Sequence, residues 1–375
     1  MAIPVEYVDT YKFRKIVQRL KGRRLRSYIY VMEFFTKTDI SVPDWRIDYT
    51  GKVAFIGSCF ADNISRLFTE RKFHVLSNPF GTIYNPLSIA TMLRNIADAK
   101  TYGEGDVFQD ARAPLWHCWG AHGSLSAPTR EDCIANLNDA ASRARAFLQG
   151  SDAVFVTLGT AFVYFLKQTG EVVSNCHRQD PNLFTRELIS VEHAVAALRD
   201  IVDSLRKIRR AKIHVVFTVS PLRHAGDGMH NNTLSKATLQ LTVNQVVAEF
   251  ASGRSGDSSG EVSVEYFPSY EIVMDELRDY RFYDADMIHL SETAEDYVFE
   301  RMAETYCDAM TRENIRKVEK FLKSVRHRIS DDSTPASVEF AKKCLAQAAE
   351  LESQIPGLDL SEERNRFQSL FSIKL

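Results

Sequence analysis

Two nucleophilic side chains, Ser58 and Cys59, stand together where the apolar run of residues 53–57 gives way to a helical pattern. A thiol in the first turn of a helix lies close to the positive end of the helix dipole and to backbone N–H groups without a partner in the helix. Such surroundings can lower the pKa of a cysteine until the thiolate exists at neutral pH. The N–H of the same residue can stabilise the oxyanion that forms when a carbonyl carbon is attacked. Cys59 is therefore the first candidate nucleophile, and Ser58 is the second.

A base for this nucleophile is present further along the chain, where Asp286 precedes His289 by three positions. A histidine can take the proton of the attacking group and later give it to the leaving group, while a carboxylate on its other ring nitrogen fixes the tautomer. Ser291 then begins a helical pattern, so both residues are expected in the loop before that helix. Nucleophile, base and carboxylate together are the parts of an acyl-transfer site.

The apolar runs of the chain predict the strands that must bring these residues together. Five short stretches are almost continuously apolar, which is typical of strands covered on both faces of a parallel sheet; they are residues 53–57, 73–77, 153–159, 213–221 and 262–270. Helical patterns separate them, at residues 86–99, 129–150, 191–208 and 235–251 and from Ser291 onward. This alternation predicts a three-layer α/β/α fold with a mainly parallel sheet of about five strands. Ligands of such sheets bind at the carboxyl ends of the strands.

Composition divides the chain into three parts. Residues 1–49 contain a basic segment, with eight Lys and Arg and no acidic residue at positions 11–26, and are expected to pack on the core or lead into it. This segment could dock on an anionic lipid, an acidic acyl-carrier protein or a phosphorylated polymer, or it could be a solvated helix. Residues 50–310 form the predicted catalytic domain, and residues 311–375 form a predicted helical extension.

The overall composition excludes several classes of protein. A net charge of −2 gives no general attraction to nucleic acid, and no apolar stretch reaches the roughly 18 residues of a membrane span. The six cysteines are scattered without a CxxC pair, which is typical of reduced thiols in the cytoplasm and not of a disulfide framework or a zinc site. We therefore expect a cytoplasmic protein without a metal site.

Several motifs, in this order, resemble those of the GSCFA family, an offshoot of the SGNH (GDSL-type) hydrolase superfamily. They are GSCFA at 57–61, NPFGTIYNP at 78–86, VTLGTAFVY at 156–164, TVSPLRH at 218–224, SKATL at 235–239, PSYEIVMDELRDYRFY at 268–283 and DMIHLS at 286–291. The resemblance covers about residues 50–310 and implies an SGNH-hydrolase-like, flavodoxin-like fold. It also implies that Cys59 takes the place of the superfamily's nucleophile, that Ser58 falls on its Asp, and that Asp286 and His289 complete a catalytic triad.

The resemblance further implies residues that would stabilise the oxyanion. Gly81 best matches the glycine whose N–H serves this purpose. Where the superfamily has an Asn as another donor, this chain has Gly159-Thr160-Ala161, so the candidates are Thr160, Asn78 and Asn85. Two residues are candidate substrate contacts, namely His122 in the Trp- and His-rich segment 116–124 and Arg223 after the fourth strand.

These features predict acyl transfer through a covalent acyl group on Cys59, by an acyltransferase or an acyl-esterase. A thiolate exchanges one thioester for another with little change in free energy, which suits coenzyme A or an acyl-carrier thioester as donor, and no covalently bound cofactor is expected. A Gly-x-Cys motif also occurs in distantly related acetyltransferases of polysaccharide biosynthesis, so an O-acylated saccharide is an expected substrate. Two alternatives are a serine esterase that uses Ser58 and a catalytically silent module that binds a glycan or a partner.

Overall fold

A computed structural model describes residues 36–252, 262–326 and 335–372. The described residues from Lys37 onward form one unit by their contacts. The basic segment at positions 11–26 lies outside the described residues, so its predicted helix and its partner stay predictions.

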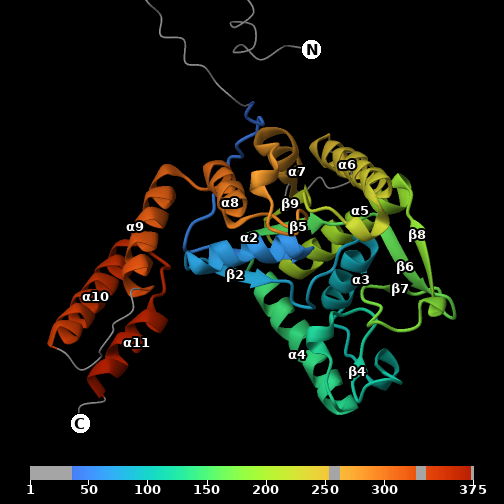
Figure 1. Ribbon diagram of the computed structural model, residues 1–375, viewed down its shortest axis with the longest axis horizontal. Coiled ribbons are helices and arrows are strands. Elements are labelled where there is room, and N and C mark those ends of the chain that lie inside the picture. The colour runs from blue at the N-terminus through green and yellow to red at the C-terminus, as the bar shows by residue number, and fades with distance from the viewer. Residues whose placement is uncertain (1–35, 253–261, 327–334, 373–375) are drawn as a thin grey trace, which may run out of the picture. The chain divides into compact units, whose positions relative to one another are not determined.

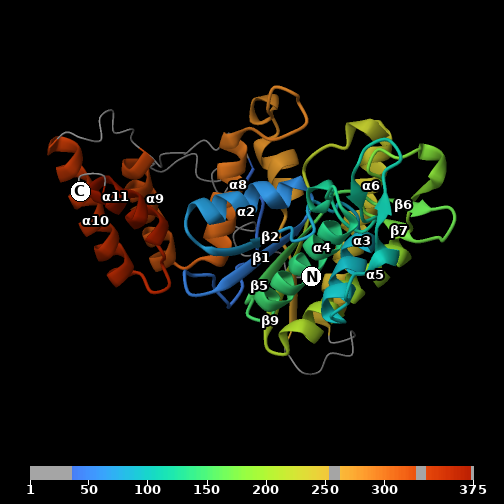
Figure 2. The ribbon, with the colours of Figure 1, turned by 90° about the horizontal axis from the view of Figure 1, so that it is seen from below.

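Five parallel strands form the central sheet in the order β10-β9-β5-β1-β2. Figure 1 labels β9, β5 and β2 of this sheet, and Figure 2 also labels β1. Their bounds are β1 Lys52–Gly57, β2 His74–Ser77, β5 Ala153–Leu158, β9 Ile213–Val219 and β10 Val262–Tyr266. Strands β5 and β9 are buried at every residue, which explains their continuous apolar sequences. The strand order reverses between β1 and β5, and ligands of open α/β sheets bind at such a reversal. The predicted mainly parallel sheet is confirmed.

Helices cover both faces of this sheet because alternate residues of each strand face opposite ways. In β1, Ala54 and Ile56 pack in one core cluster with helices α3 to α6, whereas Val53 and Phe55 pack in another with α2 and α8 (Figures 1 and 2). The bounds of the helices are α2 Cys59–Glu70, α3 Pro86–Ala97, α4 Arg130–Leu148, α5 Val191–Arg209, α6 Met229–Ala251 and α8 Glu292–Tyr306. The three-layer α/β/α prediction is therefore confirmed.

Two short antiparallel sheets were not predicted. One pairs β3 (Phe108–Gln109) with β4 (Trp116–His117), and the other has the order β7-β6-β8, from Val172–Val173, Phe162–Leu166 and Phe184–Leu188. Strands β3, β4 and β7 have only two residues each, which is too short a pattern to be seen in the sequence. Helix α6 also begins at Met229 rather than at Ser235, and β10 ends at Tyr266 rather than at residue 270.

The described residues just before β1 pack in the core, and residues 1–49 were predicted to pack on the core or lead into it. Trp45 stacks on His214 with 4.2 Å between ring centroids and on Tyr306 with 5.0 Å. Ile47 and Tyr49 are buried in the same cluster as α2 and α8. The ordered core therefore begins before residue 50.

The C-terminal extension consists of α9 (Ala309–Arg326), α10 (Pro335–Gln354) and α11 (Ser361–Ser372). Pro335 begins α10, as suits a residue without a free N–H. Buried residues of α9 join the core cluster of α2 and α8. Arg71, at the end of α2, donates to Glu319 of α9 over 2.7 Å, so ion pairs add to this apolar contact.

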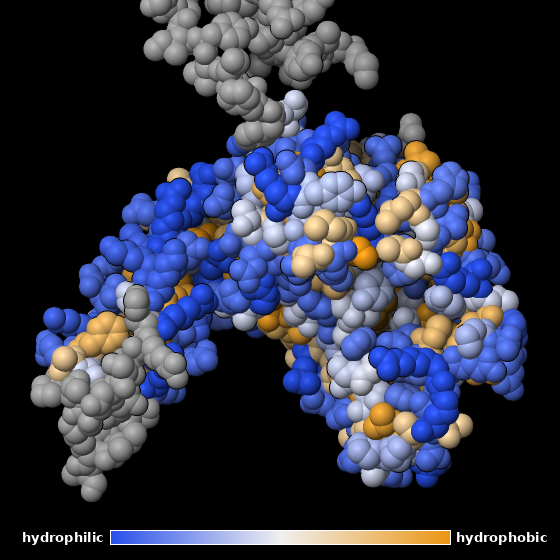
Figure 3. Space-filling model, viewed as in Figure 1, coloured by the Kyte–Doolittle hydropathy of each residue, from blue (hydrophilic) through white to orange (hydrophobic). Residues whose placement is uncertain are grey.

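The surface drawn in Figure 3 is mainly hydrophilic, with hydrophobic residues in small separate areas. Within the described ranges, no helix combines the length and apolar character that crossing a bilayer requires.

Candidate active site

The turn from β1 into α2 places Cys59 at the first helical position. Gly57 has φ +135°, and a Cβ there would lie 2.0 Å from the carbonyl oxygen of Thr157 in β5. Only glycine fits this close approach. Ser58 N–H then donates to the same oxygen over 3.1 Å, which ties the turn to β5. The glycine of the motif therefore fixes where the thiol begins its helix.

The surroundings of the Cys59 thiol oppose its ionisation at rest. Burial raises its pKa, and the nearby Asp62 carboxylate raises it further. The N–H groups of Cys59 and Phe60 and the Lys236 ammonium lower the pKa, but they do not outweigh burial. The expectation of a thiolate favoured by the helix N-terminus is wrong for this resting state, because removal of the thiol from water dominates. A base must therefore take the thiol proton during any reaction.

Asp286 and His289 lie in a loop that is closed by a bridge between Tyr283 and Leu290. Asp286 Oδ1 accepts the N–H groups of Ile288 and His289 over 2.9 Å each, and Oδ2 lies 2.6 Å from His289 Nδ1. The ring bond, together with these N–H groups, lowers the pKa of Asp286 to about 2. An ionised carboxylate only accepts hydrogen bonds, so Nδ1 carries a proton and Nε2 of a neutral ring is left as an acceptor.

A cavity of about 340 Å³ lies where β1, β5 and β9 end, at the reversal of strand order. Its lining comprises Ser58, Cys59, Tyr84, Gly159, Ser220, Leu222, Arg223, His224, Ala225, Gly226, Ile288 and His289. The candidate nucleophile and base thus share one cavity although they are far apart in the sequence. No hydrogen bond joins Cys59 to His289 among those of the described residues, and such bonds are often long before substrate binds.

Ser58 and Cys59 differ in their access to this cavity. Cys59 is partly exposed. Ser58 is 1% exposed, and its Oγ is buried without a hydrogen-bond partner. As the residue before α2 it could cap the helix, but its side chain makes no capping bond. Access favours Cys59 as nucleophile and leaves Ser58 with an unused hydroxyl at the cavity wall.

Two of the proposed oxyanion donors have other tasks in the loop after β2. Gly81 N–H donates to Asn78 O over 2.7 Å, and a Cβ on Gly81 would lie 2.2 Å from Cβ of His122. Gly81 therefore serves a tight turn and is not a free donor. Asn78 accepts Gly57 N–H over 2.7 Å and donates to Asp62 over 2.7 Å, so it supports the turn before Cys59 instead.

The remaining oxyanion candidates are also engaged elsewhere. Asn85 caps α3 by accepting Ser88 N–H over 2.9 Å. Thr160 N–H donates to Tyr84 O over 3.0 Å, and its Oγ1 lies 3.1 Å from Ser235 Oγ. Neither side chain lines the cavity. The sequence could not show this, because an Asn or Thr in a loop suits both a structural and a catalytic task.

Of the two predicted substrate contacts, Arg223 lines the cavity and His122 does not. The Arg223 guanidinium lies over the rings of Tyr280 and Tyr283, 5.3 and 4.9 Å from their centroids. His122 accepts Ser124 N–H over 3.2 Å, outside the cavity. The described residues contain no group of three or more side chains that could hold a metal ion.

Lys236 is a residue that the sequence analysis missed at this site. It is 3% exposed, and its Nζ donates to Gly159 O over 2.7 Å and to Ser220 O over 2.6 Å. Both acceptors line the cavity, so this lysine lies directly behind its wall. The helical spacing of Lys236 with Leu239 and Val243 was the available signal, because it places a lysine on the buried face of α6.

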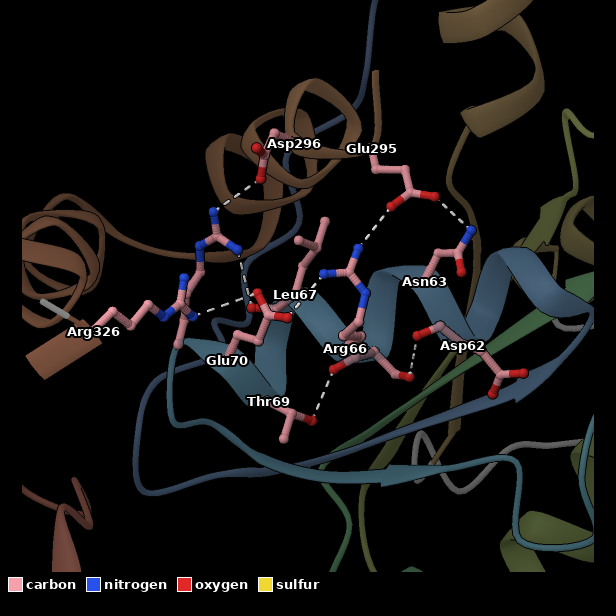
Figure 4. Close-up of polar contacts among 11 residues, drawn as sticks. Asp62, Asn63, Arg66, Leu67, Thr69, Glu70, Glu295, Asp296 and Arg326 are labelled. Atoms are coloured by element: carbon pink, nitrogen blue, oxygen red, sulfur yellow. Dashed lines mark hydrogen bonds and ion pairs between the residues drawn. The ribbon is translucent and has the colours of Figure 1, made fainter. Parts of the chain in front are cut away.

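A larger cavity, of about 700 Å³, lies between α2, α8 and α9, away from Cys59. Arg66 in its wall pairs with Glu70, also in the wall, over 2.9 Å and with Glu295 over 2.8 Å. Figure 4 shows both contacts. Arg71 contacts Asp296 over 3.1 Å. These charges compensate one another and hold the helices together, so size alone does not make this cavity the site.

Fold and site define a parallel α/β/α protein in which a cysteine after the first strand and a histidine bonded to Asp286 line the same cavity. Residues 52–302 match the model of the GSCFA family, and residues 318–371 match that of the GSCFA domain protein, C-terminal domain. The chain belongs to the GSCFA family, which confirms the resemblance of its motifs. Comparisons with curated proteins and with solved structures gave no match.

Proposed function

We propose that this protein transfers acyl groups through a thioester on Cys59, with His289 as acid–base and Asp286 as the group that orients it. The observation that carries the proposal is the shared cavity, which both Cys59 and His289 line. The 2.6 Å contact between Asp286 and Nδ1 supports it, because it leaves Nε2 available for proton transfer.

In the first half-reaction, His289 Nε2 takes the thiol proton while Sγ attacks the carbonyl carbon of the donor. A C–S bond forms, and the carbonyl electron pair moves to oxygen. When this intermediate collapses, the donor's thiolate or alkoxide leaves and receives the proton from His289. The raised pKa of Cys59 supports the need for this base.

In the second half-reaction, His289 deprotonates the acceptor, which attacks the thioester carbonyl. Sγ leaves and regains a proton, and the acyl group ends on the acceptor. If the acceptor is water the reaction is hydrolysis, and if it is a hydroxyl or amine the reaction is transfer. The chemistry at Cys59 is the same in both cases.

The oxyanion would be stabilised by groups at the start of α2, in place of those predicted. The N–H groups of Cys59 and Phe60 lie in the first turn, where an α-helix offers no internal acceptor. Both lower the pKa of the Cys59 thiol. The unpartnered Ser58 Oγ is an additional donor beside them. Donors already oriented toward developing charge are usually the largest contribution to catalysis of acyl transfer.

The cavity suits a short acyl group and part of its donor or acceptor. Its volume of about 340 Å³ is at the lower end for small-molecule sites. Arg223, which lines the cavity, offers a cation for an anionic group of a donor such as coenzyme A. All six cysteines are free thiols, which favours action in the cytoplasm.

The test is the mass of the protein after brief incubation with acetyl-CoA or p-nitrophenyl acetate. We expect one acetyl group on the wild type, none on Cys59→Ala, and slow labelling of His289→Ala. Labelling that is kept in Cys59→Ala and lost in Ser58→Ala would show that Ser58, and not Cys59, is the nucleophile. Absence of label with both donors would contradict the proposal and favour a binding module.

A further inference from the structure

A lysine ammonium without a neighbouring carboxylate is buried behind the candidate active site. Lys236 Nζ has two protein acceptors, the carbonyl oxygens of Gly159 and Ser220, at the ends of β5 and β9. These bonds use two of its three protons. No ion pair of the described residues includes Lys236, and the acidic group that acts on its charge is the Cys59 thiol.

We propose that Lys236 is the counter-charge of the Cys59 thiolate, held in place by the two carbonyl groups that end β5 and β9. The inference deepens the proposed function, since it concerns the same nucleophile. Two fixed acceptors prevent the ammonium from turning away, so its charge is already placed when Sγ becomes negative. In a buried site such a charge acts more strongly than it would in water.

The protonation of Lys236 fits this task. Burial lowers its pKa from 10.5 to about 7, while the Cys59 thiolate acts in the opposite direction. Reciprocally, Lys236 lowers the pKa of Cys59. Near neutral pH the ammonium is therefore present in part of the molecules and assists ionisation of the thiol, whereas well above pH 7 it is lost.

Other titratable groups also face the thiol and must be separated from Lys236. Asp62, on α2, raises the Cys59 pKa, and His289, Arg223 and His224 line the cavity from the loops. Tyr84 is a phenol whose pKa burial raises, so it stays protonated near neutrality. His289 lines the same cavity as Cys59 with a ring that can also carry a proton, so the test is repeated in the His289→Gln variant.

The test is the rate at which iodoacetamide alkylates Cys59, followed by peptide mass from pH 5.5 to 10.5. We expect Lys236→Met to slow alkylation at least tenfold at pH 6.5, where Lys236 is charged, and to leave the rate at pH 10.5 unchanged, where it is neutral. A tenfold change in thiolate fraction corresponds to one pKa unit. Cys176, which is also partly exposed, is the internal control and should react equally in both proteins.

Equal alkylation rates of the wild type and Lys236→Met at pH 6.5 would overturn the proposal. The same slowing of Lys236→Met at every pH would also overturn it, because such a result indicates a change in structure rather than in charge. If Lys236→Met does not fold, the His289→Gln protein decides. In that variant, an alkylation rate that rises with pH, levels off near pH 7 and then rises again supports Lys236 as the counter-charge. A single titration of the rate above pH 9 refutes this role. In Lys236→Ala, added n-propylamine should restore the rate at pH 6.5. Alkylation needs no acyl donor, so this test gives a result even if Cys59 does not transfer acyl groups.

Discussion

The buried lysine makes a quantitative prediction about stability that does not depend on any activity. In the folded protein Lys236 has a pKa of about 7, against 10.5 for an ordinary lysine. Between these values the unfolded chain binds a proton that the folded protein does not, so the free energy of unfolding must rise with pH. The full effect of the difference is about 5 kcal/mol, at 1.36 kcal/mol per pKa unit. Between pH 7 and pH 9 the wild type should gain about 2 kcal/mol from this residue.

Lys236→Met removes this gain. Two carbonyl groups also lose their donor, which costs about 1–3 kcal/mol for each, but that loss does not vary with pH. Urea unfolding at pH 7, 8 and 9 should therefore show the variant falling behind the wild type by about 2 kcal/mol over this range. Lys207→Met, the same change at an exposed ion pair with Asp98, is the control and should show no such trend. A constant difference between wild type and Lys236→Met would refute the assignment of a low pKa to Lys236.

Three further predictions concern the turn and the triad. Gly57→Ala should lower the free energy of unfolding in urea by about 3 kcal/mol or more. Alanine at φ +135° is strained, and its Cβ would lie 2.0 Å from Thr157 O. A decrease below about 1 kcal/mol would show that β1 and β5 can move apart. Asp286→Asn should slow acylation about 10²- to 10⁴-fold, because the amide no longer fixes the His289 tautomer with the proton on Nδ1. The far-UV circular dichroism spectrum should be unchanged. An unchanged rate of acylation would exclude the Asp286–His289 pair from catalysis. Ser58→Ala should slow acylation by about tenfold, because it removes a donor to the oxyanion. The free energy of unfolding should stay the same or rise slightly, because the lost hydroxyl is buried without a partner. A large decrease in that free energy would indicate a structural hydrogen bond of Ser58 instead.

The centre of the sheet was predictable because β5 and β9 are buried on both faces. Continuous apolar runs such as 153–158 need no distant partner to be recognised. Helix starts were equally local, since Thr129 and Ser291 cap α4 and α8 through their own side chains. Residue chemistry and the family motifs both pointed to Cys59 as candidate nucleophile and to Asp286 and His289, whose side chains contact each other within one loop.

What the sequence could not provide were facts that depend on contacts between distant segments. The pKa of Cys59 follows from burial by several elements, so the local helix N-terminus predicted the wrong direction. The partners of Thr160 are the Tyr84 carbonyl oxygen and the Ser235 hydroxyl, which lie in distant segments that no residue type reveals. Lys236 was visible only as a lysine on an apolar helix face, and its two acceptors come from separate strands.

The central claim is a thioester on Cys59, and the most direct measurement is the mass of the Cys59 peptide after an acyl donor is added and the reaction is stopped with acid. The account predicts an acetyl group on this peptide, and neutral hydroxylamine should remove it because the bond is a thioester. In the His289→Ala variant the acetyl group should form more slowly. An acetyl group that resists neutral hydroxylamine, or one on any other peptide while Cys59 stays free, would contradict the account.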